Sequence, residues 1–205
     1  FTYCKPGANV NDYTFTSITG ASIPDNGKLN TRVDCHSGIH VSGVTNPTWQ
    51  LISSDPPGAQ LSWLDITNPL NPVFTAPEGT PAPMTVIYQV CGNLTESACG
   101  VTTDCSTVTV YVKPKLVATL NPDPTQLCNY TELSVSMYPT GTYTYTWWNG
   151  PDGTGTQSVT SPTFTPSSEG PHSVVITETP PSGYDCSTSI IHNFTVSLDR
   201  TGPTF

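Results

Sequence analysis

The seven cysteines are the residues of this chain whose chemistry matters most, because pairs of them can form disulfides. In a polar chain that is rich in threonine and poor in lysine, they indicate an oxidising, extracellular environment. The tetrapeptide Asp-Cys-Ser-Thr occurs at Asp104–Thr107 and again at Asp185–Thr188. Each copy opens a run of alternating apolar and polar side chains, which is typical of a strand with one buried face. The spacing of the copies suits a small domain rather than a solenoid repeat.

The repeat predicts two equivalent disulfides. Cys35 and Cys128 each precede an early alternating strand, while Cys105 and Cys186 each precede a last strand. We therefore expect Cys35–Cys105 in a first domain and Cys128–Cys186 in a second. In the chain-entropy model, such long loops would give about 4 kcal/mol of stabilisation per bridge.

The three remaining cysteines allow a local bridge and leave one thiol over. Cys91 and Cys99 flank a segment of hairpin size, so we expect a short-range disulfide between them. Cys4 then has no partner. It is either a free thiol or the site of an intermolecular or interdomain bridge, since secreted proteins rarely keep an exposed free thiol.

The histidines and serines do not form a catalytic pattern. His36 and His40 lie four residues apart, which on a strand separates them by about 13 Å, too far to share a metal ion. His172 and His192 are isolated in the sequence. We find no Gly-x-Ser-x-Gly elbow, phosphate-binding loop, Cys-x-x-Cys pair or His-Glu-x-x-His motif. We therefore predict a protein that is not an enzyme, with no catalytic residue, no metal ligand and no cofactor.

Two binding alternatives remain. Asn149 to Gly153 and Asn121 to Asp123 place oxygen-bearing side chains in predicted turns, and Ca²⁺ prefers such ligands. Asp and Asn in turns, however, usually bond to nearby backbone. Trp147 and Trp148 are adjacent and so face opposite sides of a strand. One belongs to the core, and the other, which we take to be Trp148, is the candidate for stacking on a glycan.

Composition and pattern predict an all-β chain. Charged residues make up only 10% of it, and 21 prolines and 16 glycines suit many turns and protected edges. No stretch sustains apolar residues with helical spacing, whereas short alternating runs bounded by Pro, Gly, Asn or Asp are frequent. Several short strands at this spacing are typical of a β-sandwich.

The repeat and the prolines divide the chain. We expect an N-terminal arm or first strand at 1–25, one sandwich at 26–114, a second at 115–200, and a tail or linker at 201–205. Pro114 lies in the boundary sequence Lys-Pro-Lys and cannot donate a ladder hydrogen bond. The boundary is too short to be a flexible linker, so we expect limited bending between the domains.

Domain two resembles a known module. Its sequence runs from a cysteine before the second strand to TYTYTWWNGPDGTG, then SPTFTPSSEGPHSVVITET, and closes with YDCST. This order is similar to the PKD-like, immunoglobulin-like modules of bacterial secreted and cell-surface proteins. The matching positions are Trp147, Gly150, Asp152, Gly153, Phe164, Pro166, Gly170 and Val174–Ile176. Domain one resembles the same module more loosely, through Trp49 and the segment Pro72–Gly79. The resemblance implies tandem disulfide-stabilised immunoglobulin-like sandwiches, and such modules serve many functions.

The net charge and the distribution of basic residues argue against some classes of function. The net charge is −9, and the six lysines and arginines are scattered, which argues against binding to nucleic acid. No run of about 18 apolar residues is present to insert into a membrane. We therefore expect a structural or adhesive segment of an extracellular surface protein or fibre. Its unmatched arm would join copies of the chain, or neighbouring domains, by adding a strand to an exposed edge. The alternative is a module that binds surface glycans or calcium and accompanies a secreted hydrolase.

Overall fold

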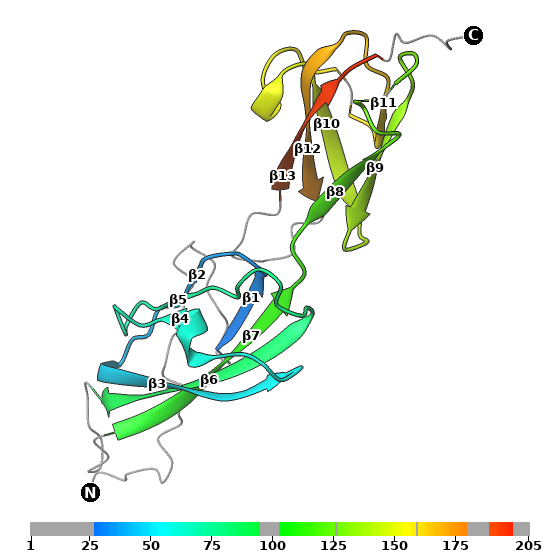
Figure 1. The fold of residues 1–205 in the computed structure, drawn as a ribbon. Helices are drawn as coiled ribbons and strands as arrows, with labels where there is room; N and C mark the ends of the chain where they lie inside the picture. The colour runs from blue at the N-terminus through cyan, green and yellow to red at the C-terminus, as the bar shows by residue number, and fades with distance from the viewer. Residues whose placement is uncertain (1–26, 95–102, 126, 159, 180–188, 199–205) are drawn as a thin grey trace, which may run out of the picture. The chain divides into compact units, whose positions relative to one another are not determined.

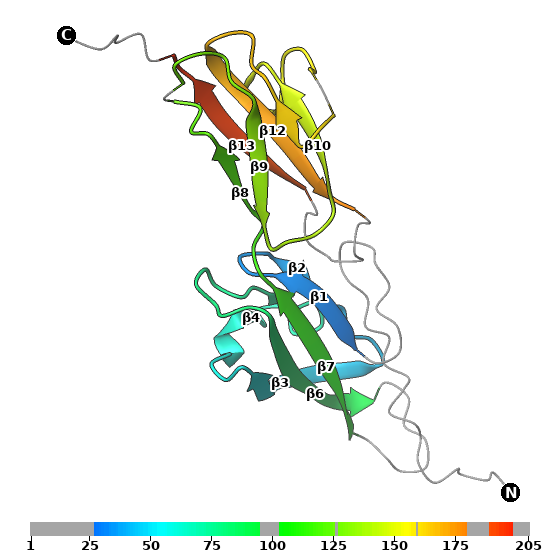
Figure 2. The same ribbon diagram turned by 90° about the vertical axis from the view of Figure 1, so that its right-hand side faces the viewer.

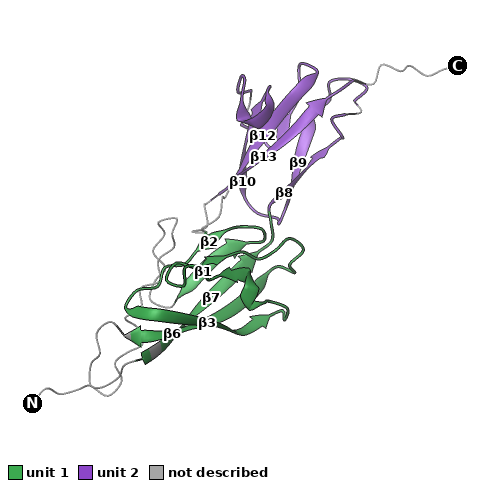
Figure 3. Cartoon of the chain, turned by 60° about the vertical axis from the view of Figure 1, so that its left-hand side comes forward, with its two compact units in different colours: residues 1–115, 183–186 green, residues 116–182, 187–205 purple. Residues whose placement is uncertain are grey.

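The computed structural model describes residues 27–94, 103–125, 127–158, 160–179 and 189–198. The predicted arm at 1–25, the tail at 201–205, Cys4, Cys99 and Cys186 lie outside these ranges. The chain divides into two compact units (Figure 3): residues 1–115 with 183–186, and residues 116–182 with 187–205. We call them domain one and domain two. Their described parts contain strands and two single 3-10 turns but no α-helix, so the all-β prediction is confirmed.

Domain one has two sheets. The larger has the order β1-β7-β6-β3, with β1 parallel to β7 and the other pairs antiparallel (Figure 1). The smaller has the order β2-β5-β4. The strands are β1 (Lys28–Arg32), β2 (Ser37–Gly38), β3 (Val44–Asp55), β4 (Leu64–Asp65), β5 (Val73–Phe74), β6 (Met84–Leu94) and β7 (Thr103–Lys113).

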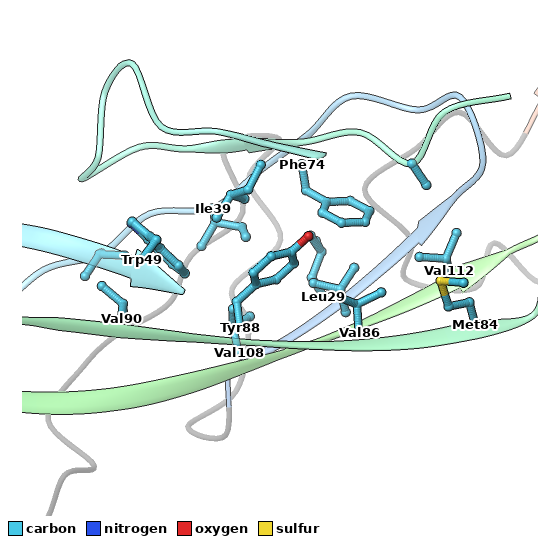
Figure 4. Packing of buried hydrophobic residues seen from close by; sticks show 14 of the residues in the cluster. Leu29, Ile39, Trp49, Phe74, Met84, Val86, Tyr88, Val90, Val108 and Val112 are labelled. Carbon is cyan, nitrogen blue, oxygen red and sulfur yellow. The ribbon is translucent and has the colours of Figure 1, made fainter. Parts of the chain in front are cut away.

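The two sheets of domain one enclose a single core. On β7 buried valines alternate with outward residues, and on β6 the buried residues Met84, Val86, Tyr88 and Val90 alternate in the same way, so each strand turns one apolar face inward. Figure 4 shows Tyr88 reaching from β6 toward Phe74 on the other layer, and their ring centroids are 6.1 Å apart in an edge-to-face arrangement. Both side chains are fully buried. The Tyr88 hydroxyl donates a hydrogen bond to the carbonyl of Gln60 at 2.9 Å, so its polar end is paired.

Domain two also has two sheets, of three strands each. One has the order β10-β12-β13 (Figure 2), the other has the order β11-β9-β8 (Figure 1), and all pairs are antiparallel. The strands are β8 (Val117–Asn121), β9 (Leu133–Tyr138), β10 (Tyr143–Trp148), β11 (Thr163–Phe164), β12 (Gly170–Glu178) and β13 (Ser189–Val196). Residues from both sheets share a core around Trp147, which is completely buried.

Both domains follow immunoglobulin topology. With the strands of domain two lettered A, B, C, E, F and G in chain order, its sheets read A–B–E and C–F–G. In domain one the first strand pairs with the last, so the sheets read A′–G–F–C and B–E–D. The prediction of two tandem immunoglobulin-like sandwiches is therefore confirmed at the level of fold class.

A tryptophan on strand C anchors each core, as is typical of this fold. Trp49 on β3 donates its indole N–H to the carbonyl of Pro69 at 2.9 Å. Trp147 on β10 donates its indole N–H to the carbonyl of Ser161 at 2.7 Å. In both domains the acceptor lies in the segment that precedes strand E, which is β5 in domain one and β11 in domain two. The prediction that Trp147 is the core residue of its pair agrees with this position.

The predicted disulfide pairing was wrong. Cys105 is bonded to Cys91, with a Cα–Cα distance of 4.0 Å. The two residues are direct cross-strand partners on β6 and β7, so the bridge joins neighbouring strands of one sheet. This excludes both Cys35–Cys105 and Cys91–Cys99. Cys35 does lie in a disulfide.

Domain two does not form its predicted bridge either. Cys128 is an exposed free thiol, so it is not bonded to Cys186. It lies in the loop between β8 and β9, outside the core. The similarity between the repeats therefore did not extend to equivalent bridges.

Candidate functional site

Three of the four histidines contact neighbouring side chains of their own domain. Nδ1 of His36 is 2.7 Å from the Thr75 hydroxyl oxygen, and Nδ1 of His40 is 2.7 Å from Oδ1 of Asn71. His172 is buried in the core of domain two, where its ring lies 5.9 Å from that of Phe164. Within the part of the chain that the structure describes, no three His, Cys, Asp or Glu side chains cluster closely enough to hold a metal ion.

The polar side chains of the two calcium candidates hold turns together. Oδ1 of Asp123 accepts hydrogen bonds from the Thr125 amide at 2.9 Å and from its hydroxyl at 2.7 Å. These bonds lower the pKa of the Asp123 carboxyl. Oδ1 of Asn149 accepts a hydrogen bond from the Thr156 amide at 2.6 Å. These side-chain oxygens thus serve the local backbone, as Asp and Asn in turns usually do.

Asp152 closes the other candidate turn onto the sheet. It has a positive φ of 54°, and it exchanges two hydrogen bonds with the side chain of Asn193 on β13. Ser173 on β12 completes the attachment, because its hydroxyl accepts from the Gly153 amide and donates to the Gly150 carbonyl. The turn at Pro151–Gly153 therefore lies over the outer face of β12 and β13, which the sequence did not predict.

Trp148, the candidate for glycan stacking, lies on this same outer face and is half-buried. Its indole Nε1 is buried, and no described group accepts a hydrogen bond from it. A Cβ built on Gly153 would lie 3.8 Å from this nitrogen. The turn thus covers part of the ring, and only the remainder of its surface is accessible to a ligand.

The residues of the boundary between the domains are fixed to domain one. The amide of Val33 donates to the carbonyl of Lys113 at 3.0 Å. Nη1 of Arg32 donates to the carbonyl of Pro114 at 2.9 Å, and Arg32 is almost fully buried. Nζ of Lys115 lies 2.7 Å from Oδ2 of Asp34. Sequence reasoning proposed a boundary at Lys113–Lys115 but did not predict these partners, which lie some eighty residues earlier in the chain.

The ion pair at the boundary shifts the pKa values of both of its members, Asp34 and Lys115. The hydrogen bond and the charge of Lys115 lower the pKa of Asp34, and the same partner raises the pKa of Lys115. Both side chains are about half exposed, so solvent screens their attraction. The pair therefore contributes little to the free energy of unfolding.

The final strands of the two domains differ in burial. On β7 the inward residues Val108, Val110 and Val112 are fully buried, and β1 pairs with this strand. On β13 the inward residue Val196 is fully buried, but the inward residues Ile190 and Phe194 are only partly buried, although both pack against the core. Among the described strands, none pairs with the outer edge of β13.

Comparison with known proteins gives similarity to solved structures only. No family model and no curated protein matches the chain. The four N-terminal Ig domains of Dscam1 isoform 1.9 have 10% identity and a TM-score of 0.30, covering 92% of this chain and 47% of that one. EC1-3 of mouse protocadherin-24 has 10% identity and a TM-score of 0.32, covering 92% and 71%. A variant of titin domains I67–I69 has 12% identity and a TM-score of 0.31, covering 84% and 62%. The chain thus spans about half the length of the Dscam1 structure.

Proposed function

We propose that this chain is a non-enzymatic structural and adhesive segment of an extracellular surface protein or fibre, in which two sandwiches act as a stiff tandem spacer. The observation that carries this proposal is the attachment of residues 113–115 to domain one by Val33, Arg32 and Asp34. Only residues 114–116 separate β7 from β8. A connection this short, with both ends held in strands, restricts bending.

The chemistry of the described residues supports the same proposal. Several side chains that could catalyse or bind a metal instead form hydrogen bonds within turns and between strands, among them those of His36, His40, Asp123 and Asp152. Disulfides at Cys35 and at Cys91–Cys105 suit an oxidising extracellular setting. Among the described residues, no helix is long and apolar enough to cross a bilayer.

Nuclear spin relaxation tests the spacer. We expect amides of both domains to report one common rotational correlation time. An Arg32→Ala/Asp34→Ala variant removes two attachments of the boundary and should give separate, shorter times for the two domains. Lys28→Ala, an exposed residue on the same strand, is the matched control and should keep the common time. Independent tumbling of the domains in the unmodified protein would contradict the proposal.

Self-association through residues 1–25 is part of this proposal. The arm has no counterpart before domain two, and its alternating residues Tyr13–Ile18 are suited to strand pairing. Light scattering over a range of concentrations measures association. A non-reducing gel then shows whether Cys4 links copies covalently. A monomer at every concentration would remove self-association but leave the spacer intact.

A further inference from the structure

The core of domain two is not completely covered along the edge of β13. In domain one, Leu29 and Thr31 on β1 lie beside β7 and are fully buried, and this pairing seals the inward valines of β7. In domain two, the equivalent first strand β8 pairs with β9 in the opposite sheet. Ile190 and Phe194 therefore remain partly exposed at the edge of the core.

The hydrogen bonds of Ser197, just after β13, show which backbone groups of this strand point away from β12. The amide of Ser197 donates to the carbonyl of Pro124 at 3.0 Å, and the carbonyl of Ser197 accepts from the Leu127 amide at 3.3 Å. The register between β12 and β13 has no shift. Because a strand repeats every two residues, the amides and carbonyls of Ile191, Asn193 and Thr195 also point away from β12. A strand added here would continue the short contact that Pro124 and Leu127 begin.

Nothing in β13 protects this edge. Natural edge strands are usually blunted by Pro, Lys or a bulge, and β13 contains none of these and no charged residue. By contrast, the edge strand β3 contains Pro47 and two register shifts. The edge of β10 already pairs at its end, where the Ser158 amide donates to the Trp147 carbonyl at 2.9 Å. β13 is thus the longest regular edge among the described strands of domain two.

We propose that β13 accepts a strand from a second copy of this chain, formed by residues 13–18. Tyr13, Phe15 and their flanking threonines alternate with period two, and the segment carries no charge. Two uncharged strands pair without the local repulsion that the net charge of −9 imposes elsewhere. The apolar face of the added strand covers Ile190 and Phe194, as β1 covers the valines of β7.

The position of the segment in the chain suits a donor. Residues 1–26 precede the first described residue, Gly27, which leads directly into β1. Residues 19–26 span at most about 28 Å when fully extended. That length allows the segment to reach a neighbouring copy while β1 keeps its place beside β7. This inference deepens the proposed self-association by assigning its acceptor.

Two full-length variants test the pairing. Ile191→Pro removes an outward amide without removing a bond to β12, because proline is tolerated at such edge positions. Ile191→Thr keeps the amide and is its matched control. Phe15→Asp introduces a charge into the donor segment. By sedimentation, we expect the unmodified chain and Ile191→Thr to associate, and Ile191→Pro and Phe15→Asp to remain monomers.

An equimolar mixture of the two monomeric variants supplies the decisive measurement. Ile191→Pro keeps its donor and Phe15→Asp keeps its acceptor, so one productive contact forms and assembly stops at a dimer. A synthetic peptide of residues 12–19 should also dissociate assemblies of the unmodified chain at millimolar concentration. The peptide result does not depend on any variant folding.

Several outcomes would overturn the inference. A mixture that stays monomeric, or an Ile191→Pro chain that folds and still associates, excludes β13 as the acceptor. Association of Phe15→Asp at the level of the unmodified chain excludes residues 13–18 and points to pairing between two β13 edges. If the unmodified chain is a monomer at all concentrations, the inference fails while the spacer, tested by relaxation, can stand. If the two domains tumble independently but the chain still associates, the spacer proposal fails while the inference about β13 can stand.

Discussion

The first strands of the two sandwiches join opposite sheets. In domain one, β1 pairs in parallel with the last strand, β7, and leaves the edge of β2 uncovered by any described strand. In domain two, β8 pairs with the second strand, β9, and leaves the edge of β13 uncovered. Because β2 has two residues and β13 has eight, the consequences are unequal. Two domains of similar topology can therefore cover the last strand or leave its long edge without a described partner strand, depending on which strand the first strand pairs with.

The centres of the two cores are, in contrast, alike. Each strand C contributes a tryptophan whose indole N–H donates to a carbonyl in the segment that precedes strand E. In domain two, Trp147 stacks on Phe164 with ring centroids 5.0 Å apart. Variation between the domains is therefore concentrated at the edges and in the disulfides, and the following predictions test that division.

Removal of the strand C tryptophans should have the largest effect. Trp147→Ala leaves a cavity in the core and removes the donor to Ser161, and we expect a loss of about 3 to 5 kcal/mol of unfolding free energy in domain two. Trp49→Ala should destabilise domain one by a similar amount. Calorimetry resolves the two transitions. Loss of both transitions in either single variant would show that the cores are not independent.

Removal of the bridge between β6 and β7 should destabilise domain one alone. A loop of about 15 residues gives about 3 kcal/mol in the chain-entropy model, so Cys91→Ala/Cys105→Ala should lower that transition markedly. Cys128→Ser is the control, since its thiol is exposed and free. It should move neither transition. A shift of the domain two transition in the double variant would argue against this assignment.

Alanine substitutions at equivalent inward positions on the two final strands should lower the free energy of unfolding by different amounts. Val110→Ala removes a fully buried side chain, and we expect a loss of about 2 kcal/mol. Ile190→Ala removes a larger but partly exposed side chain, for which we expect only about 1 kcal/mol in the monomer. Chemical denaturation at low protein concentration measures both. Equal or reversed costs would show that the edge of β13 is already closed in the monomer.

The ion pair at the boundary should give a small effect that depends on pH. The folded pKa of Asp34 is below its usual 3.8 and that of Lys115 above its usual 10.5. The contribution is therefore fully present between these two values. It is lost as the pH falls through the folded pKa of Asp34 or rises through that of Lys115. The difference in melting temperature between the unmodified chain and Asp34→Asn should follow this window and shrink with added salt. A difference unchanged at pH 2 would contradict the prediction.

Prediction from sequence was most successful where the signal is local. The alternation in Leu133–Met137 and Tyr143–Trp148 predicted β9 and β10. Because Trp147 and Trp148 are adjacent on a strand, the sequence also predicted that one of them lies in the core. Side-chain alternation indicates directly which face of a strand is buried, so this prediction does not require knowledge of the neighbouring strands. Turn residues such as Asp123 likewise kept their expected local bonds.

Prediction failed where two segments distant in sequence had to be matched. The repeat suggested Cys35 for Cys105, but the register of β6 on β7 places Cys91 directly opposite. The partners of the boundary, Arg32 and Asp34, were missed for the same reason. No periodicity within a segment states which strand becomes its neighbour.

Patterns within short segments were enough to predict the all-β class and the inward faces of several strands, and the resemblance to PKD-like modules added the immunoglobulin-like design. The tertiary structure alone decided the cysteine partner, the attachment of residues 113–115 and the sheet that each first strand joins. Leu29 in β1 and Ala118 in β8 occupy similar alternating patterns, yet they are buried in opposite layers of their sandwiches. That choice depends on which edge can exchange hydrogen bonds with the strand, and an edge exists only once the rest of the sandwich has formed.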